Sequence, residues 1–537
     1  NAEGTLVVTF NGEIYNYLEL KKELQQQGEQ FKTSGDTEVL LVLYHLYKEK
    51  MLQKLDGMFA FAIYDKKNNK VFCARDRFGE KPFFYSLQQG KQLVFASEMK
   101  AIQQFTNDRT PNNVMLYNYL SFGSLTNHED QSDTFYQNIK RLTPAHYLSV
   151  DLKNFKIETK RYWDIDVNNV NHHIKLKEAK ETLHELFYTS VNRRMRSDVN
   201  IGSSLSGGLD SSLIVCVIDD LVKKNKAEHS FANTSFKQNT FSARFPGYKK
   251  DEGTFMQQVI DRTNVEAHYV FPDNKKLVDD INTVFHFQEE PFGGTSILAQ
   301  YKVMALAKEN NVTVLLDGQG ADEILAGYHG YYNIFFRNME KIGRQRYKAE
   351  LKAYEQLHRN NQINEKQGKN LEYLVRKWFP GKAHAIKKTV AYIQHKRKKI
   401  FNEDFYDAYA DKLFTANNSF SDLNEALYRS TMCGDLQTLL RYADRNSMAN
   451  SREVRLPFLS HELVSFLFTL PADFKIHEGW TKYILRTTFS KILPESIAWR
   501  VDKIGYEPPE KQWMKSAAMR DFILNSRREI GRASCRE

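Results

Sequence analysis

The segment Ser206-Gly207-Gly208-Leu209-Asp210-Ser211-Ser212 has the composition of an anion-binding turn. It follows the short strand-like run 199–205 and precedes an apolar helical pattern that begins near Leu209. Glycine lets an anion approach the backbone closely, and the free N–H groups at a helix start attract negative charge. The three serine hydroxyls are further donors, and the loop lacks the lysine of a Walker loop. We therefore predict a phosphate-binding loop at residues 206–212.

A carboxylate inside this loop requires a partner of opposite charge. Asp210 stands in the first helical turn, where an acid also stabilises the helix by itself. A second acidic turn, Asp317-Gly318-Gln319-Gly320-Ala321-Asp322-Glu323, follows the strand-like run 312–316. The carboxyl ends of parallel strands share one edge of a sheet, so the two turns are expected to converge. Carboxylates beside a phosphate favour a Mg²⁺ ion between them, although two unrelated surface turns are the alternative.

The elements that must position these turns alternate strand and helix. Runs 199–205, 240–245 and 312–316 read as short strands, and 209–221 and 297–311 read as helices by their apolar spacing. This alternation predicts an α/β parallel sheet with helices, over residues 175–525.

Residues 1–165 have a different pattern. Short strand-like runs lie at 5–10, 57–65, 70–76, 81–87 and 92–98, two more lie within 142–166, and one helix is expected at 37–50. We predict an α+β domain of layered antiparallel sheets, separated from the second domain by the polar run 166–173.

Composition restricts the classes of protein. The chain has 537 residues, 41% of them hydrophobic and 26% charged, and no window approaches the ~18 apolar residues of a membrane span. The four cysteines have neither disulfide-like nor metal-like spacing, which favours a cytoplasmic protein.

The net charge of +10 arises in residues 337–399, which hold 18 basic and 5 acidic residues, and the remainder sums to −3. We expect a basic helical insertion at 337–400, either simply solvated or facing an acidic partner or a membrane surface. Nucleic acid is not expected, because no aromatic residues are interleaved on a strand platform.

Motifs along the whole chain resemble glutamine-hydrolysing asparagine synthetase, a glutamine amidotransferase fused to a synthetase that cleaves ATP to AMP and pyrophosphate. Besides the two turns, the matching segments are FNGEIYN (10–16), GDTEVLL (35–41), GMFAFAIYD (57–65), ARDRFGEKPFFY (74–85), FASEMKAI (95–102), DRNSMANSREVRLPFL (444–459) and TKYILR (481–486). The resemblance covers nearly all of residues 1–525 outside the insertion. Residues 529–537 look like a non-native tail.

The resemblance implies roles for individual residues. ATP and pyrophosphate would contact Ser206, Gly207, Gly208, Asp210, Ser211, Ser212, Ala243, Asp317 and Gly318. Mg²⁺ would bind Asp210 and Asp322. Lys482, which is expected in a helix, would stabilise charge at phosphorus. Arg455 would pair with Glu453 or a neighbouring acid, in either a pocket-shaping or a purely structural role. Glutamine would contact Asn11, Gly12, Glu13 and Asp36.

Three departures from the family pattern qualify this reading. The family's amino-terminal nucleophilic cysteine and its upstream arginine segment are absent from the sequence as given, which suggests an N-terminal truncation, and Cys73 is expected to be a buried strand residue. Gln319 stands where the family carries a catalytic glutamate. Thr295, in the loop 289–301, stands near the position of the family's substrate-binding arginine.

These departures leave the acceptor open. The first hypothesis is amidation of aspartate to asparagine with glutamine-derived ammonia, through an acyl-adenylate. The second is amidation of another carboxylate, such as a uronic acid in polysaccharide synthesis, and the third is a non-catalytic homologue. We expect small-molecule substrates, namely glutamine or ammonia, a carboxylate and ATP, and a homodimer.

Overall fold

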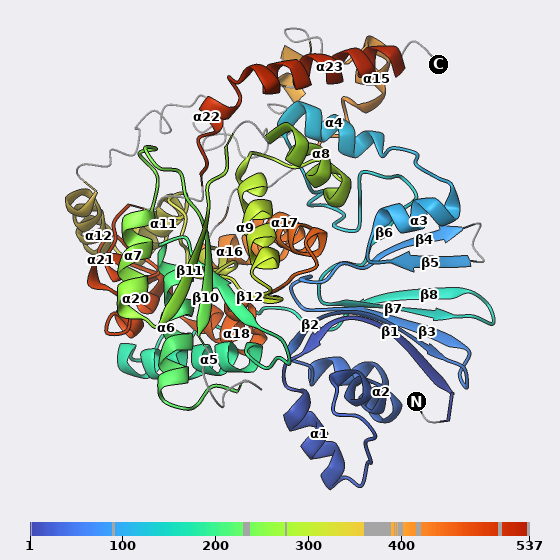
Figure 1. Ribbon diagram of the computed structural model, residues 1–537, viewed down its shortest axis with the longest axis horizontal. Coiled ribbons are helices and arrows are strands. Elements are labelled where there is room, and N and C mark those ends of the chain that lie inside the picture. The colour runs from blue at the N-terminus through green and yellow to red at the C-terminus, as the bar shows by residue number, and fades with distance from the viewer. Residues whose placement is uncertain are drawn as a thin grey trace. The chain divides into compact units, whose positions relative to one another are not determined.

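The computed structural model describes the chain outside residues 2, 89–91, 229–236, 274–276, 359–387, 391, 394, 396–400, 415–419, 421, 503–506 and 534–537. The chain forms two compact units (Figure 1). The first unit contains Asn1–Leu183, Gly320–Leu440 and Phe458–Leu485, and the second contains His184–Gln319, Arg441–Pro457 and Arg486–Glu537.

The first unit contains the predicted antiparallel sheets. One sheet has the strand order β1-β2-β3-β7-β8 and the other has the order β5-β4-β6. Their strands are β1 (Leu6–Ile14), β2 (Gly57–Asp65), β3 (Lys70–Arg75), β4 (Phe84–Gln88), β5 (Gln92–Ala96), β6 (Lys140–Arg141), β7 (His146–Asp151) and β8 (Lys156–Arg161). The α+β prediction for this region is therefore confirmed.

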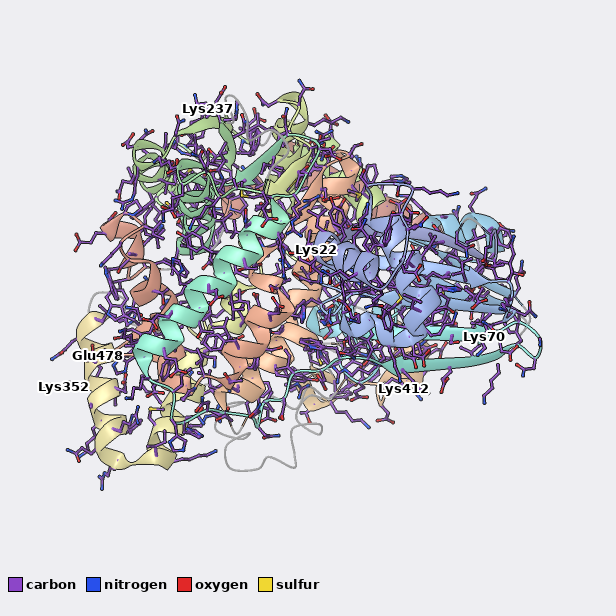
Figure 2. The ribbon with its side chains drawn as sticks, turned by 90° about the horizontal axis from the view of Figure 1, so that it is seen from below. Lys22, Lys70, Lys237, Lys352, Lys412 and Glu478 are labelled. Carbon is purple, nitrogen blue, oxygen red and sulfur yellow. The ribbon has the colours of Figure 1, made fainter. Side chains whose placement is uncertain are left out.

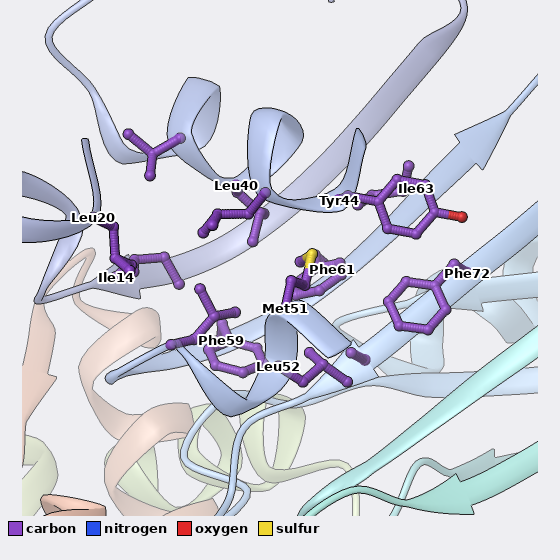
Figure 3. Close-up of a cluster of buried hydrophobic side chains, with 14 of the residues drawn as sticks. Ile14, Leu20, Leu40, Tyr44, Met51, Leu52, Phe59, Phe61, Ile63 and Phe72 are labelled. Carbon is purple, nitrogen blue, oxygen red and sulfur yellow. The ribbon is translucent and has the colours of Figure 1, made fainter. Parts of the chain in front are cut away.

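Strand β2 contributes alternate side chains to two hydrophobic cores on its opposite faces. Phe59, Phe61 and Ile63 face a cluster with α1 (Tyr17–Gln26) and α2 (Asp36–Tyr47), which Figure 3 shows. Ala60 and Ala62 face the opposite way, toward side chains of the second sheet. Successive side chains of a strand point to opposite faces, so β2 is apolar on both sides. Beyond the second sheet, α3 (Met99–Thr106) packs on β4 and β5. Helix, sheet, sheet and helix thus form four layers.

The expectation of one helix in this region was wrong. The described residues also contain α1, α3, α4 (Asn113–Phe122) and the 3₁₀ helix η1 (Lys48–Gln53). Helix α1 carries only two buried leucines, Leu20 and Leu24, among charged and polar residues, so its apolar stripe is too narrow to stand out in the sequence.

The second unit contains a five-stranded sheet with the order β11-β10-β9-β12-β13, and every pair in it is parallel. The strands are β9 (Ile201–Ser204), β10 (Gln238–Ala243), β11 (Val265–Val270), β12 (Val314–Leu316) and β13 (Glu453–Arg455). The predicted α/β parallel sheet is confirmed. The sequence analysis did not identify β11 and β13, because Glu266 and His268 interrupt the apolar residues of Val265–Val270, and Glu453–Arg455 has only three residues.

Helices cover the parallel sheet. Helices α6 (Leu209–Lys223) and α7 (Gly253–Arg262) lie on one side, and α9 (Ser296–Glu309) lies on the other (Figure 1). Because all five strands run the same way, Ser204, Ala243, Leu316 and Arg455 end at one edge. That edge is where ligands bind in open α/β sheets.

The remaining elements complete the two units. They are α5 (Leu176–Arg194), α8 (Leu277–Gln288), α10 (Ala321–Ile324), α11 (Tyr331–Ile342), α12 (Arg344–Leu357), α15 (Glu403–Tyr409), α16 (Leu423–Met432), α17 (Asp435–Ala449), η4 (Pro457–Leu459), α18 (His461–Thr469), α19 (Ala472–Lys475), β14 (Ile476–His477), β15 (Trp480–Thr481), α20 (Tyr483–Phe489), α21 (Glu495–Ala498), α22 (Glu510–Trp513) and α23 (Ala517–Ala533). Among the described helices, none is long and apolar enough to cross a membrane.

Two predicted segments lie partly outside the described residues. The basic insertion 337–400 begins in α11 and includes α12, which carries Lys352 (Figure 2), whereas most of 359–400 is not described. The segment 529–537, set apart as a tail, continues α23 as far as Ala533, and residues 534–537 are not described.

Candidate active site

The predicted phosphate loop is a tight turn in the second unit. Strand β9 ends at Ser204 and α6 begins at Leu209, with Gly207 in the left-handed region at φ +78°. The Ser206 N–H donates to Ser211 Oγ over 3.2 Å, and the two seryl oxygens are 3.0 Å apart. The turn is therefore held by its own hydroxyls at the start of a 15-residue helix, where the helix dipole favours an anion.

Asp210 lies in the first turn of α6, against the second acidic turn. A Cβ added to Gly318 would lie 2.9 Å from Asp210 Cβ and 3.1 Å from Ser211 N. Only glycine permits this approach, so the structure brings the segment after β12 directly against the phosphate loop. The predicted convergence of the two turns is confirmed as far as Gly318.

Asp317 links the ends of two neighbouring strands. Its Oδ1 accepts a hydrogen bond from the Ser204 N–H over 3.3 Å, and its own N–H donates to the Arg455 carbonyl. Burial raises the pKa of the Asp317 carboxyl. Asp317 directly follows β12, and its side chain therefore connects the end of β12 to the end of β9. These two strands precede the acidic turn and the phosphate loop.

The other predicted nucleotide residues occupy the same sheet edge. Ala243 is the buried last residue of β10. Arg455 ends β13, and its Nε lies 2.6 Å from Glu453 Oε1 while Nη1 donates to the Arg194 carbonyl over 3.0 Å. Arg455 is thus paired with Glu453 as expected, and it also holds the end of α5.

The rest of the acidic turn lies in the first unit, where Asp322 pairs with Lys482. Lys482 Nζ is 2.7 Å from Asp322 Oδ1, and the lysine side chain is only 4% exposed. The sequence placed Lys482 in a helix. In the structure it instead lies between β15 and α20 at φ +52°, and this turn directs the side chain inward.

Gly327 makes this ion pair sterically possible. A Cβ at Gly327 would lie 1.8 Å from Asp322 Oδ1 and 2.4 Å from Lys482 Cε. Any side chain there would displace the carboxylate or the ammonium. The sequence analysis missed Gly327, since a glycine after a short helix reads as an ordinary helix end.

Glu323 adds a buried acid behind the pair. It is 1% exposed and accepts a hydrogen bond from the Tyr328 hydroxyl. Burial, followed by the neighbouring Asp322 carboxylate, raises the pKa of Glu323 to about 7. Burial and the Asp322 carboxylate thus disfavour the charged form of Glu323, and the ion pair itself is formed by Asp322 and Lys482.

Gln319 occupies a turn between Gly318 and Gly320, as predicted. Its Oε1 is buried, and no hydrogen-bond donor in the described part of the chain reaches it. A buried carbonyl without a donor costs free energy, so this atom is available to a donor on a ligand.

The loop 289–296 is held by two buried ion pairs in the second unit. Arg441 Nη1 lies 2.7 Å from Glu290 Oε2, and Arg445 Nη2 lies 2.9 Å from Glu289 Oε2. Thr295, the residue that precedes α9, is 8% exposed, and its hydroxyl has no partner among the described residues. Both arginines near this loop are therefore neutralised by its own glutamates.

The predicted glutamine-binding residues lie together in the first unit. Asn11, Gly12 and Glu13 belong to β1, and a Cβ at Gly12 would lie 2.0 Å from the Met58 carbonyl oxygen. Asp36 begins α2, and its Oδ2 accepts the Ile14 N–H over 3.0 Å. Burial raises the pKa of Asp36, against the opposing effect of that hydrogen bond. The acid thus lies beside the strand end that carries Glu13.

Cys73 lies inside β3, as expected. It is fully buried, and burial raises the pKa of its thiol. A buried thiol of this kind is inert.

Two carboxylates suit Mg²⁺ by their chemistry. Among the described residues, no three His, Cys, Asp or Glu side chains are grouped as a complete metal cage. Mg²⁺ prefers oxygen ligands and usually keeps waters and phosphate oxygens besides one or two carboxylates. Within the second unit, Asp210 lies at the phosphate loop with Gly318 packed against it. Within the first unit, the Asp322 side chain is 20% exposed.

Comparisons with known proteins identify the family. The model described as "Asparagine synthase" matches residues 182–529, and the model described as "Glutamine amidotransferase domain" matches residues 1–163. "Asparagine synthetase [glutamine-hydrolyzing] 1" of Bacillus subtilis (strain 168) is 32% identical over 97% of this chain and 78% of its own length. "Asparagine synthetase [glutamine-hydrolyzing] 3" of the same organism is 28% identical over 97% of this chain and 80% of its own length.

The first match spans more than half of the chain, and the phosphate loop, the acidic turn and Lys482 all lie within it. The chain therefore belongs to the asparagine synthase family, as an enzyme of the ligase class that carries a glutamine amidotransferase domain before its synthase domain.

Proposed function

We propose that this protein amidates aspartate to asparagine at the expense of ATP, with ammonia released from glutamine. The observation that carries the proposal is the phosphate loop 206–212, with Asp210 in its first helical turn and Gly318 packed against it. The carboxylate oxygen of aspartate attacks the α-phosphorus of ATP, and the bond to pyrophosphate breaks. Ammonia then attacks the acyl carbon, AMP leaves, and one proton is released.

Residues of the loop bind the leaving pyrophosphate in this proposal. The N–H groups at the start of α6 and the Ser206, Ser211 and Ser212 hydroxyls donate to its oxygens, together with the backbone of Gly207 and Gly208. These donors are fixed before the reaction, so they stabilise developing charge without reorganising. Ala243 contacts the adenine through its backbone.

Asp210 and Asp322 are the proposed Mg²⁺ ligands. When bound, Mg²⁺ neutralises charge on the phosphate oxygens. Lys482 supplies a positive charge to the α-phosphate that the carboxylate attacks, and its buried pairing with Asp322 over 2.7 Å supports this role because it fixes the ammonium in place. Gln319 accepts a hydrogen bond from a donor on a bound ligand through its amide oxygen, which no described residue reaches.

Asn11 and Gly12 stabilise the oxyanion of glutamine hydrolysis in this proposal, and Glu13 and Asp36 hold the charged ends of glutamine. Support comes from the position of Asp36 against the end of β1, beside Glu13.

A second acceptor is favoured by one observation. Both arginines beside the loop 289–296 are paired with its glutamates, and the position near the family's arginine holds Thr295. An acceptor that is recognised mainly through hydroxyl groups, such as a uronic acid, suits a neutral loop better than the α-carboxylate of aspartate does.

The test is pyrophosphate release with ammonium and a panel of carboxylates that includes aspartate and uronic acids. Asp210→Asn is expected to reduce release about 10²-fold or more, because it removes a metal charge and little volume. Asp220→Asn is the matched control on the same helix, since Asp220 pairs with Lys224 near the surface. Release by Asp210→Asn at the rate of the control would refute the proposed metal site.

A further inference from the structure

Arg500 is a buried arginine near the phosphate loop that no part of the proposed chemistry uses. It follows α21 in the second unit, and its side chain is 7% exposed. Its Nη1 lies 2.6 Å from Glu252 Oε1, and Glu252 is equally buried and precedes α7. Moving two charges into the protein interior is expensive, so a pair retained there needs a reason.

The guanidinium of Arg500 reaches the loop itself. Nη1 also donates to the Gly207 carbonyl over 3.4 Å, and the guanidinium carbon lies 3.8 Å from the centre of the Phe255 ring. Its Nε and Nη2 donate to the two carboxylate oxygens of Asp502, whose side chain is half exposed. One planar group therefore joins the loop, the start of α7 and the segment after α21.

The Gly207 carbonyl determines where the next N–H points. In a trans peptide the C=O and the following N–H point in opposite directions. With its carbonyl turned toward Arg500, the peptide directs the Gly208 N–H into the turn, where it lies 3.3 Å from Ser206 Oγ. Glycine populates positive and negative φ about equally, so a Gly-Gly peptide on its own is free to rotate.

Helix α7 leaves no room for a side chain at Gly207. A Cβ there would lie 3.0 Å from Phe255 Cβ, 3.1 Å from Met256 N and 3.2 Å from the Glu252 carbonyl oxygen. The first turn of α7 thus packs directly against the loop, and Arg500 contacts that turn through Glu252 and Phe255.

We infer that Arg500, held by Glu252 and stacked on Phe255, is a positioning residue that fixes the Gly207–Gly208 peptide in the orientation that binds pyrophosphate. The inference rests on the proposed function of the loop. Burial raises the pKa of Glu252 to about 7, against the opposing charge of Arg500, which indicates that the acid depends on this arginine to remain ionised.

The test separates orientation from folding with Arg500→Lys. Lysine keeps the positive charge for Glu252 but loses the planar contact with Phe255 and the geometry that reaches two acceptors at once. We expect the dissociation constants of ATP and of inorganic pyrophosphate, measured by titration with Mg²⁺ present, to rise about tenfold while the melting temperature stays within about 3 °C. Asp502→Asn is the matched control, because it removes only the exposed partner of the same arginine, and it should bind both probes like the wild type.

The steady-state parameters give a second readout. Arg500→Lys should raise KM for ATP more than it lowers kcat, and Arg500→Met should raise it further. Unchanged binding by Arg500→Lys would overturn the inference, as would an equal loss in Asp502→Asn. If the wild type binds both probes but releases no pyrophosphate with any carboxylate, the proposed function fails while the binding ratios still decide the role of Arg500.

Discussion

Lys482 Nζ lies 2.7 Å from Asp322 Oδ1, in a space that Gly327 leaves open. The pair joins a lysine at positive φ to a carboxylate in a helix of only four residues, α10. The ion pair is thus a structural contact, and it also fixes in place the lysine ammonium that the proposed chemistry needs.

Lys482→Met is expected to reduce pyrophosphate release at least 10²-fold and to lower the free energy of unfolding by about 3 kcal/mol, because it leaves a partly buried carboxylate without its cation. Denaturant titration and steady-state kinetics measure the two effects. The double variant with Asp322→Asn should recover much of the stability and none of the activity. Recovery of activity in the double variant would contradict the proposed role of the lysine.

Gln319 should act through hydrogen bonding. Its buried Oε1 has no donor within the described residues, so a ligand is expected to supply one. Gln319→Glu should keep kcat/KM within about tenfold of the wild type, whereas Gln319→Ala should lose more than tenfold relative to it, at least ~1.4 kcal/mol in the barrier. Equal activity of the Ala variant and the wild type would show that the side chain is not used.

Gly318→Ala should raise KM for ATP, because its methyl group would lie 2.9 Å from Asp210 Cβ and push the two turns apart. We expect an increase of about tenfold or more, roughly the loss of one well-placed contact to the nucleotide. Gly35→Ala is the matched control, since a Cβ at Gly35 meets no atom within 4 Å and its φ is −77°. Ammonium-dependent pyrophosphate release compares the two, and equal KM values would contradict the steric argument.

Lys475 makes stability depend on pH. It is fully buried, and burial lowers its pKa to about 7, although Nζ donates to Asn424 Oδ1 and the Leu470 carbonyl. The unfolded lysine binds its proton up to about pH 10.4, so between pH 7 and pH 10 the unfolded state holds more protons and the free energy of unfolding should rise with pH. Below pH 7 both states are protonated and this contribution is constant.

Lys475→Met should lack that rise. The measurement is the difference in denaturant midpoint between wild type and variant at pH 7 and pH 9.5, with an unchanged m value as the sign of two-state behaviour. A difference that stays constant over this range would mean that the lysine keeps its ordinary pKa in the folded protein.

Strands and helices whose apolar residues recur with a clear period could be predicted from the sequence. Gly57–Asp65 was predicted as a strand with both ends correct, and the start of α6 at Leu209 follows from the glycine pair before an apolar helix. By contrast, Lys482 was placed in a helix, because its left-handed backbone is decided by the packing of the turn and not by its neighbours in sequence. Tertiary packing overrides local preference at such positions.

Contacts between distant segments account for what the sequence did not reveal in the candidate site. Gly327 reads as a helix end, and Glu252 and Arg500 are separated by 248 residues, so no local pattern connects them. The residues of the phosphate loop could be identified because they are consecutive. The side chains of Glu252 and Arg500, which contact the loop and the first turn of α7, could not be identified in this way.

The order of the parallel sheet has a consequence for synthesis on the ribosome. Strand β12 pairs with β9 on one side and with β13 on the other, yet β13 begins only at Glu453, long after β12 ends at Leu316. At about 5 to 20 residues per second, the chain needs on the order of ten seconds to supply that partner. During this interval β12 exposes a row of unpaired backbone groups, the kind of edge that recruits foreign strands. Nascent-chain aggregation should therefore peak while residues 317–452 are being translated, and chaperone demand should fall once β13 has emerged.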